Sequence, residues 1–313
     1  SLGDLQSAVA GDRKPLILKV PLALGGKRLD QALAELLPDF SRSRLTAMIK
    51  AGDIKLDGAT AQPKTKLLGG ETVAAILSPR AEESAFTPEP VPLAVIHEDD
   101  AIIVLDKPAG LVVHPAAGNW SGTLLNGLLF RNPSVANLPR AGIVHRLDKD
   151  TSGCLVLGRH RKALERLMKL FKAGAIDKTY WAVVEGGPET DEGLIDLPLG
   201  RLDPTRGWWM KHDPAGLPSQ TRWRVLGRGV DAAGKPLAWL ALSPLTGRTH
   251  QLRVHCATMG FAILGDPIYG SGGATPLQLH AREIIVPMAK NGPPTTAVAP
   301  VPEHMRATLE RCG

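Results

Sequence analysis

The stretch HRLDKDTSG, residues 145–153, decides how the rest of the sequence is interpreted. It is a charged segment between two short apolar runs, 143–144 and 154–157, which are typical of buried strands. The Thr-Ser-Gly at its end is turn-prone, and we expect it to return the chain to the sheet. The segment therefore presents Asp148 on a loop with cations on both sides, where it is either catalytic or a simple ion-pair partner.

A second cationic stretch, GRTHQLRVH at 247–255, offers this aspartate a partner. Nearby cations favour the ionised form of a carboxyl group. An ionised Asp148 could act as a nucleophile or an electrostatic stabiliser, but it would be a poor general acid. Arg253 has the planar fork that could hold Asp148 by two parallel bonds. The alternative is an ordinary loop ion pair that pins two strands together.

The composition is that of an ordinary globular protein of 313 residues, a length that favours about two domains. A net charge of +6 is compatible with an anionic partner but does not require one. The three cysteines lie far apart, which favours a reducing compartment over a disulfide or zinc framework. No apolar run reaches the roughly 18 residues of a membrane span, and the first residues lack a signal-peptide pattern. We therefore expect a cytoplasmic protein without a membrane partner.

A proline- and glutamate-rich segment divides the chain. It covers residues 78–92 and is typical of an extended linker. We therefore predict a small unit at 16–77 and a larger one at 93–313. In the small unit, leucines at helical spacing from Leu29 predict a helix that Pro38 ends.

A second helix and a hairpin complete the predicted small unit. Ser41 is the expected N-cap of the helix and Gly52 its end. The alternation at 53–56, followed by Asp57-Gly58, predicts a half-buried strand and a turn. A further strand at 72–76 could pair with the strand at 53–56.

The small unit is also basic, with nine Lys or Arg against six Asp or Glu. Several cations stand at the start of the second helix, where backbone amides favour phosphate. We interpret them as a nucleic-acid surface, although a solvated face is the alternative. The unit resembles the S-four-like RNA-binding domain in Arg28-Leu29-Asp30, Ser41-Arg42, Ile49, Gly52 and 55–58. The candidate RNA-binding residues are Arg28, Ser41, Arg42, Arg44, Lys50 and Lys55.

The larger unit groups its strands instead of alternating them strictly with helices. This order predicts an α+β domain with a mixed, largely antiparallel sheet and not a doubly wound fold. The helical patterns lie at 161–173 and near 249–259. The expected strands are 93–96, 102–105, 111–113, 143–144, 154–157, 180–184, 223–226, 239–242 and 284–287.

Familiar signatures of other enzyme classes are absent from the sequence. There is no GxxxxGK[ST] phosphate loop and no GxGxxG after a strand. Ser152 lacks the GxSxG elbow of a serine hydrolase. His250 and His255 belong to no HExxH motif, so we expect no metal site.

Five motifs in one order identify a resemblance. They are KPAGLVVHP at 107–115, HRLDKDTSG at 145–153, KTYWAVV at 178–184, GRTHQLRVH at 247–255 and GDPIYG at 265–270. Together they resemble the RluA-type family of ribosomal large-subunit pseudouridine synthases. The similarity covers roughly residues 90–285 in addition to the small unit.

The resemblance implies a cofactor-free isomerisation of uridine in RNA, in which the base is detached and rejoined through carbon 5. Asp148 matches the catalytic aspartate, and Arg253 matches the arginine that pairs with it. Tyr180 matches the active-site tyrosine that stacks on the uracil and could help to move the carbon 5 proton. Arg146 would fill the gap left by an extruded uridine. His145 and Lys178 are further expected RNA contacts.

We therefore expect a monomeric RNA pseudouridine synthase that acts on 23S large-subunit ribosomal RNA. The alternatives are a member of the same family that acts on transfer RNA, a non-catalytic ribosome-assembly factor, and a hydrolase that uses Ser152 with a histidine. The family pattern is followed only loosely at 207–223. The neighbouring Trp208 and Trp209 there could offer a stacking surface or could cover the sheet.

Overall fold

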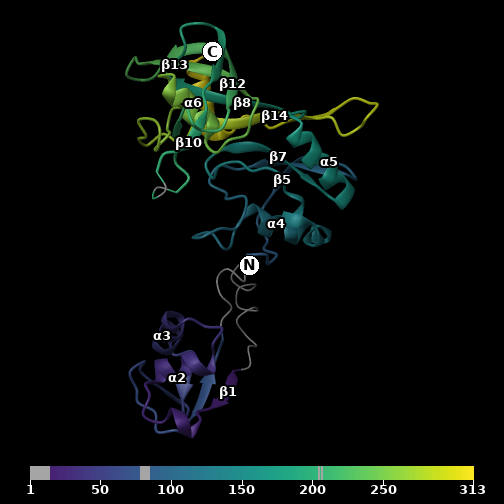
Figure 1. Cartoon of the computed structure of the whole chain (residues 1–313). Coiled ribbons are helices and arrows are strands. Elements are labelled where there is room, and N and C mark those ends of the chain that lie inside the picture. Colours follow the sequence, from purple (N-terminus) through teal and green to yellow (C-terminus); the bar gives the residue numbers. More distant parts are fainter. Residues whose placement is uncertain (1–14, 78–84, 204, 206) are drawn as a thin grey trace. The chain divides into compact units, whose positions relative to one another are not determined.

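The computed structural model describes residues 15–77, 85–203, 205 and 207–313. The chain forms two compact units, Ser1–Arg80 and Ala81–Gly313, and each is described by itself (Figure 1). In its described residues, the first has a small sheet and two α-helices. The second is built on a long sheet with helices packed against it.

The smaller unit has the two helices and the hairpin that its sequence predicts. Its helices are α2 (Leu29–Leu36) and α3 (Arg42–Ala51), preceded by the 3-10 turn Leu22–Leu24. Its antiparallel sheet has the order β1-β4-β2-β3. The strands are β1 (Leu16–Lys19), β2 (Ile54–Leu56), β3 (Ala59–Thr60) and β4 (Thr72–Ala75).

Helix α3 begins and ends as expected. The Ser41 Oγ accepts the Arg44 N–H at 3.3 Å, and Gly52 adopts φ 81° after the last turn. Gly52 suits this place because the left-handed conformation is costly for other residues. The core beneath the helix includes the fully buried Leu33, Leu45 and Ile54.

Nine strands of the larger unit form one mixed sheet in the order β5-β6-β7-β14-β8-β13-β12-β9, with β15 paired to β14. All of these pairs are antiparallel except β7 with β14, which confirms the predicted largely antiparallel sheet. The strands are β5 (Ala94–Glu98), β6 (Ile102–Lys107), β7 (Ser152–Gly158), β8 (Asp177–Glu185), β9 (Glu192–Asp196), β12 (Gln220–Val230), β13 (Pro236–Pro244), β14 (Leu279–Val286) and β15 (Thr295–Val298).

Four α-helices and a separate hairpin complete the described part of the larger unit. The helices are α4 (Leu124–Arg131), α5 (Arg161–Lys172), α6 (Gln251–Thr258) and α7 (Glu303–Arg311), with 3-10 turns at Pro133–Asn137 and Pro139–Gly142. The hairpin pairs β10 (Leu199–Arg201) with β11 (Met210–His212). Helix α5 packs on β7, and α6 lies beside β13 (Figure 1). Helices α5 and α6 confirm the two predicted helices, whereas α4 and α7 were not predicted.

Two of the expected strands are wrong. At 111–113 the carbonyls of Val112 and Val113 accept the N–H groups of Leu124 and Leu125, so this segment caps α4 instead of pairing in a sheet. The run at 143–144 forms only a single bridge, from Ile143 to Leu157. Both runs are apolar because they contribute to the core, which a strand pattern alone does not distinguish.

Part of the segment expected as a linker at 78–92 packs against the larger unit. Residues 78–84 lie outside the described residues, and 85–92 belong to the larger unit. The side-chain amide of Asn126 donates to the carbonyls of Ala85 and Thr87, both at 2.9 Å. The Glu89 N–H in turn donates to the Asn126 carbonyl at 3.0 Å. These bonds fasten the segment to α4 despite its proline-rich sequence.

Candidate active site

Residues 144–151 form an irregular loop that leads into β7 near the middle of the sheet. The loop is held from beneath by Lys107, whose side chain is 1 % exposed. Its Nζ donates to the carbonyls of Pro108, Leu111 and Lys149 at 2.8–2.9 Å. Burial lowers the pKa of Lys107 to about 8, and the charges of Asp150 and Asp148 oppose this shift. A buried ammonium thus ties the KPAGLVVHP segment to the loop of Asp148.

The turn itself spans Asp148 to Thr151, whose N–H donates to the Asp148 carbonyl at 3.0 Å. Thr-Ser-Gly was expected to make this turn, but Ser152 and Gly153 already belong to β7. Gly153 has φ +111°, and a β-carbon there would lie 2.2 Å from the carbonyl oxygen of Ala281. Glycine is required because the backbones of β7 and β14 approach each other so closely.

Asp148 lies on a cleft of about 940 Å³, and its side chain is 28 % exposed. Arg253 Nη1 is 3.6 Å from one carboxylate oxygen, and His250 Nε2 is 3.9 Å from the other. Lys149, next in the sequence, is exposed. The carboxylate is therefore open to a ligand while a nearly buried guanidinium stands beside it.

Arg253 pairs with Asp148, as predicted, but its two parallel bonds go elsewhere. They join it to Asp266, with Nε–Oδ2 and Nη2–Oδ1 distances of 3.0 and 2.7 Å. Asp266 is fully buried and also accepts the N–H groups of Ile268 and Tyr269. The predicted fork on Asp148 is wrong because Asp266 already occupies the planar edge of the guanidinium, which leaves Nη1 for Asp148.

The charges in this network stabilise one another. Burial alone would raise the pKa of Asp266, but the hydrogen bonds and charge of Arg253 outweigh burial and lower it. Burial alone would lower the pKa of Arg253, but Asp266 and then Asp148 raise it. Arg253 thus stays a cation although it is only 7 % exposed, and it can stabilise negative charge at Asp148.

His250 precedes α6 in a left-handed conformation with φ 54°. Its Nδ1 lies 2.7 Å from the Tyr269 hydroxyl, which accepts the Met210 N–H at 2.9 Å. With the hydroxyl proton donated to Nδ1, a neutral imidazole carries its own proton on Nε2, on the side of Asp148. Burial lowers the pKa of His250, which favours this neutral form. His255 instead joins α6 to neighbouring segments, because its ring nitrogens contact the Thr221 hydroxyl and the Leu197 carbonyl.

Tyr180 and Lys178 line the same cleft from β8. Tyr180 is in register with Ala281 on β14 and Leu242 on β13, which places it at the centre of the sheet. Burial raises the pKa of Tyr180 strongly, with a smaller contribution from the charge of Asp148. The Nζ of Lys178 lies 5.8 Å from the centre of the Phe171 ring. The structure therefore brings Tyr180, Arg253 and Asp148 to one cleft, as the sequence predicts.

Arg146 and His145 point to different roles. Arg146 is exposed, donates to Thr249 Oγ1 at 3.3 Å and lies 5.7 Å from the centre of the Trp208 ring. His145 instead accepts the Val156 N–H through Nε2 at 2.9 Å. Burial, together with the charge of Lys178, lowers the pKa of His145 to about 3, so the ring is neutral. This geometry favours a structural role for His145 over the expected RNA contact.

In the smaller unit, two of the candidate RNA-binding arginines meet at one carboxylate. Asp30 is 3 % exposed, accepts two bonds from Arg28 and lies 3.4 Å from Arg42. Burial alone would raise the pKa of Asp30, but the two arginines lower it. Their side chains are 39 % and 53 % exposed, so each keeps an accessible face. Arg44 lies over the Phe40 ring, while the side chains of Lys50 and Lys55 are exposed and Ser41 caps α3.

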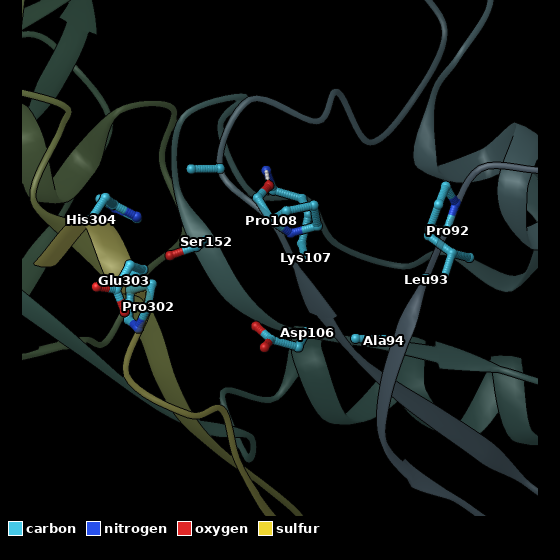
Figure 2. A pocket seen from close by; sticks show the side chains of 11 residues that line it. Pro92, Leu93, Ala94, Asp106, Lys107, Pro108, Ser152, Pro302, Glu303 and His304 are labelled. Carbon is cyan, nitrogen blue, oxygen red and sulfur yellow. Dashed lines mark hydrogen bonds between the residues drawn. The ribbon is translucent and has the colours of Figure 1, made fainter. Parts of the chain in front are cut away.

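A second hollow lies beside β6, β7 and the start of α7 (Figure 2). Ser152 stands between His304 on one side and Lys107 and Asp106 on the other. The Ser152 Oγ lies 2.7 Å from His280 Nδ1, but these two residues are only 3 % and 0 % exposed.

This pair does not support a hydrolase. Nε2 of His280 faces the Ala299 carbonyl at 3.4 Å and not a carboxylate, and burial lowers the pKa of His280 to about 4. A serine nucleophile needs a base that a third group orients. The Ser152–His280 contact therefore fastens β7 to β14.

Other classes of site find no support in the described residues. No group of three or more His, Cys, Asp or Glu side chains in them could hold a metal ion. No helix in the same part of the chain is long and apolar enough to cross a bilayer. Cys154, Cys256 and Cys312 are free and buried, and burial raises the pKa of the first two to about 12.

Sequence reasoning missed three residues that organise the site: Lys107, Asp266 and Tyr269. All lie in motifs that the sequence displays, KPAGLVVHP and GDPIYG, but single residues in them carry no signal of burial. A lysine at the end of an apolar strand and an aspartate before a proline both resemble surface residues until the contacts are known.

Comparison with known proteins agrees with this geometry. The profile of the RNA pseudouridylate synthase family matches residues 101–258, and that of the S4 domain matches residues 27–73. The human RNA pseudouridylate synthase domain containing 1 has a similar structure, with a TM-score of 0.56 and 28 % identity. That alignment covers 68 % of this chain and 85 % of the human one.

Two bacterial relatives carry the same name, ribosomal large subunit pseudouridine synthase D. That of Xanthomonas campestris is 43 % identical over 306 residues, which cover 93 % of this chain and 90 % of the relative. The Neisseria meningitidis serogroup B protein is 45 % identical over 254 residues, or 81 % of this chain and 66 % of the relative. The family match contains the loop of Asp148, the strand of Tyr180 and the helix of Arg253, and the chain therefore belongs to the RNA pseudouridylate synthase family.

Proposed function

We propose that this enzyme converts uridine to pseudouridine in large-subunit ribosomal RNA, with Asp148 as its catalytic residue and without a cofactor. The observation that carries the proposal is the cleft in which the partly exposed Asp148 faces Arg253, itself fixed by the buried Asp266. The names of the bacterial relatives support the choice of ribosomal RNA.

The reaction needs groups that this cleft supplies. The bond from C1′ to N1 of the uridine breaks, and a bond from C1′ to C5 forms. The C5 proton leaves, and N1 gains a proton, so the isomerisation is balanced without an oxidant or reductant. Asp148 would act as an anion at the base–sugar bond, and Arg253 would keep it charged while water is excluded. Tyr180 would form the wall on which the uracil stacks.

The uridine must leave its stack to reach Asp148. Arg146 is the exposed residue of the loop that could enter the vacated space, because a guanidinium both stacks on bases and bonds to phosphate. The smaller unit would add affinity through Arg28 and Arg42, and this part of binding should weaken with salt.

Asp148→Asn tests the catalytic role, and Asp150→Asn is its matched control because Asp150 is an exposed carboxylate of the same loop. We expect Asp148→Asn to abolish pseudouridine formation while RNA affinity stays within about threefold, and Asp150→Asn to remain active. Near-normal turnover by Asp148→Asn would refute the assignment. Pseudouridine mapping of ribosomal and transfer RNA from cells that lack the protein identifies the substrate. Loss of a pseudouridine from transfer RNA alone would favour the alternative that the enzyme acts on transfer RNA.

A further inference from the structure

Trp208 is an exposed aromatic side chain beside the catalytic cleft that the reaction itself does not explain. It lies between β10 and β11, and 66 % of its surface is accessible. Arg146, which lines the cleft, lies 5.7 Å from the centre of its ring, and Arg201 lies 5.8 Å from it. A large apolar ring that stays exposed between two cations is typical of a binding surface.

Local contacts hold this tryptophan in place. The fork of Arg201 donates two bonds to the Gly207 carbonyl, from Nε at 3.1 Å and from Nη2 at 2.7 Å. The Leu202 N–H donates to the Trp209 carbonyl at 2.8 Å. The next residue, Met210, donates its N–H to the Tyr269 hydroxyl, which contacts His250 beside Asp148. The residues that flank Trp208 are thus fixed within the hairpin, and Met210 fastens the hairpin to the residues beside Asp148.

The chemistry of this surface selects one kind of ligand. An exposed indole face binds a flat ring, and two neighbouring guanidinium groups bind an anion. A nucleotide has both features in the right relation, since each base is attached to a phosphate through its sugar. An apolar protein segment would cover the ring but would leave the two cations without an anion.

We propose that Trp208 is the stacking platform for an unpaired base that neighbours the target uridine, and that Arg146 and Arg201 contact phosphates beside it. The inference rests on the proposed function in taking RNA as the substrate. It adds a contact that would recognise the RNA strand beside the target uridine through its shape and flexibility, because only an unpaired base can stack on Trp208. Arg146 would connect the two places, since it belongs both to the cleft and to the surface around Trp208.

The test measures the affinity of Asp148→Asn protein for an RNA oligonucleotide that contains the mapped target uridine. Addition of Trp208→Ala should weaken binding about 5- to 150-fold, the range for the loss of one stacked base. Trp208→Phe keeps an aromatic face and should retain most of the affinity. Leu194→Ala is the control, because Leu194 is an apolar residue 50 % exposed on β9. It should bind like the parent.

Two further measurements separate stacking from other causes. The slope of affinity against salt should be the same for the parent and for the Trp208→Ala variant, because stacking releases no counterions. An abasic nucleotide at the stacking position should weaken binding to the parent but should not weaken binding to Trp208→Ala further. Circular dichroism and thermal unfolding should be unchanged, since removal of an exposed side chain opens no cavity.

Trp208→Ala affinity within twofold of the parent would overturn the inference, as would equal losses for Trp208→Ala and Trp208→Phe. Failure of the proposed function is a separate result. It would appear as the absence of pseudouridine in RNA treated with the wild-type enzyme, whereas the platform is judged by binding to a variant that needs no turnover.

Discussion

The buried pair of Arg253 and Asp266 should be the most sensitive point of the catalytic unit. Asp266→Ala removes two charge-assisted bonds to Arg253 and leaves the N–H groups of Ile268 and Tyr269 without their acceptor. Arg253 would then be a guanidinium 7 % exposed whose remaining ion-pair partner among the described residues is Asp148, at 3.6 Å. Breaking a buried pair in this way costs about 3–5 kcal/mol of unfolding free energy.

Activity should fall together with stability. Without Asp266, the guanidinium of Arg253 is free to turn toward Asp148. The carboxylate would then shift and would no longer be open to a ligand. A displacement of about 1 Å at a catalytic group can cost about 100-fold in rate. We therefore expect at least this loss in single-turnover pseudouridine formation, measured at a temperature where the variant is fully folded.

Urea unfolding followed by tryptophan fluorescence measures the stability term. All six tryptophans lie in residues 81–313, so the signal reports on the larger unit alone. Asp191→Ala is the matched control, because it breaks an arginine–aspartate pair whose aspartate is 92 % exposed. That change should cost less than about 1 kcal/mol.

A double substitution separates the two effects. Arg253→Met with Asp266→Leu removes both charges, so it leaves no unpaired ion in the interior and should be more stable than Asp266→Ala. It should nevertheless be inactive, because Asp148 has lost its cation. A cost below about 1 kcal/mol for Asp266→Ala, or full activity of the double variant, would refute this account of the site.

Three further predictions concern the loop, the pH dependence and the small unit. Lys107→Met should lower the unfolding free energy by about 3 kcal/mol or more, because three carbonyls lose a charged donor; calorimetry of the variant checks this. His145 is neutral in the fold with a pKa of about 3 against an ordinary value of about 6.5. The stability that neutral His145 contributes is therefore complete above pH 6.5 and is lost progressively toward pH 3, by about 2 kcal/mol at pH 5. The free energy of unfolding of His145→Gln should accordingly depend less on pH in that range. Deletion of residues 1–77 should weaken RNA binding and flatten its salt dependence while single-turnover chemistry at saturating RNA is retained; unchanged affinity would show that the small unit does not bind this RNA.

The sequence predicted the central elements well because their local signals agree with their environment. Helix α3 has a capping serine, an apolar face and a terminal glycine, and all three act as expected. Strand β7 is a continuous apolar run because it is buried on both faces. Helix α4 was not predicted because its residues from Leu124 to Leu129 are all buried, so the helix has no polar face that would give an amphipathic pattern.

The candidate site shows a similar division. Motif order brought Asp148, Tyr180 and Arg253 together correctly, although about a hundred residues separate the first from the last. Which groups share a hydrogen bond could not be predicted, since Asp148 and Asp266 are equivalent partners for an arginine until burial distinguishes them. His145 was expected to contact RNA as a member of the HRLDKDTSG motif, but its Nε2 accepts the Val156 N–H, a contact within the fold that the motif alone does not reveal.

The arrangement around Asp148 separates the residues that hold the loop and its partners in place from those that face the cleft. Lys107 and Asp266 are buried and His145 is partly buried, and all three bond to protein groups, so substitution of any of them should change stability first and catalysis as a consequence. Asp148 and Arg146 remain accessible, so their substitution should change catalysis or RNA binding with little effect on stability. Tyr269 connects the two sets, because its hydroxyl joins the hairpin that carries Trp208 to His250 beside the carboxylate of Asp148. If RNA contacts the hairpin as proposed, the hydrogen bonds from Met210 through Tyr269 to His250 link that contact to the surroundings of Asp148.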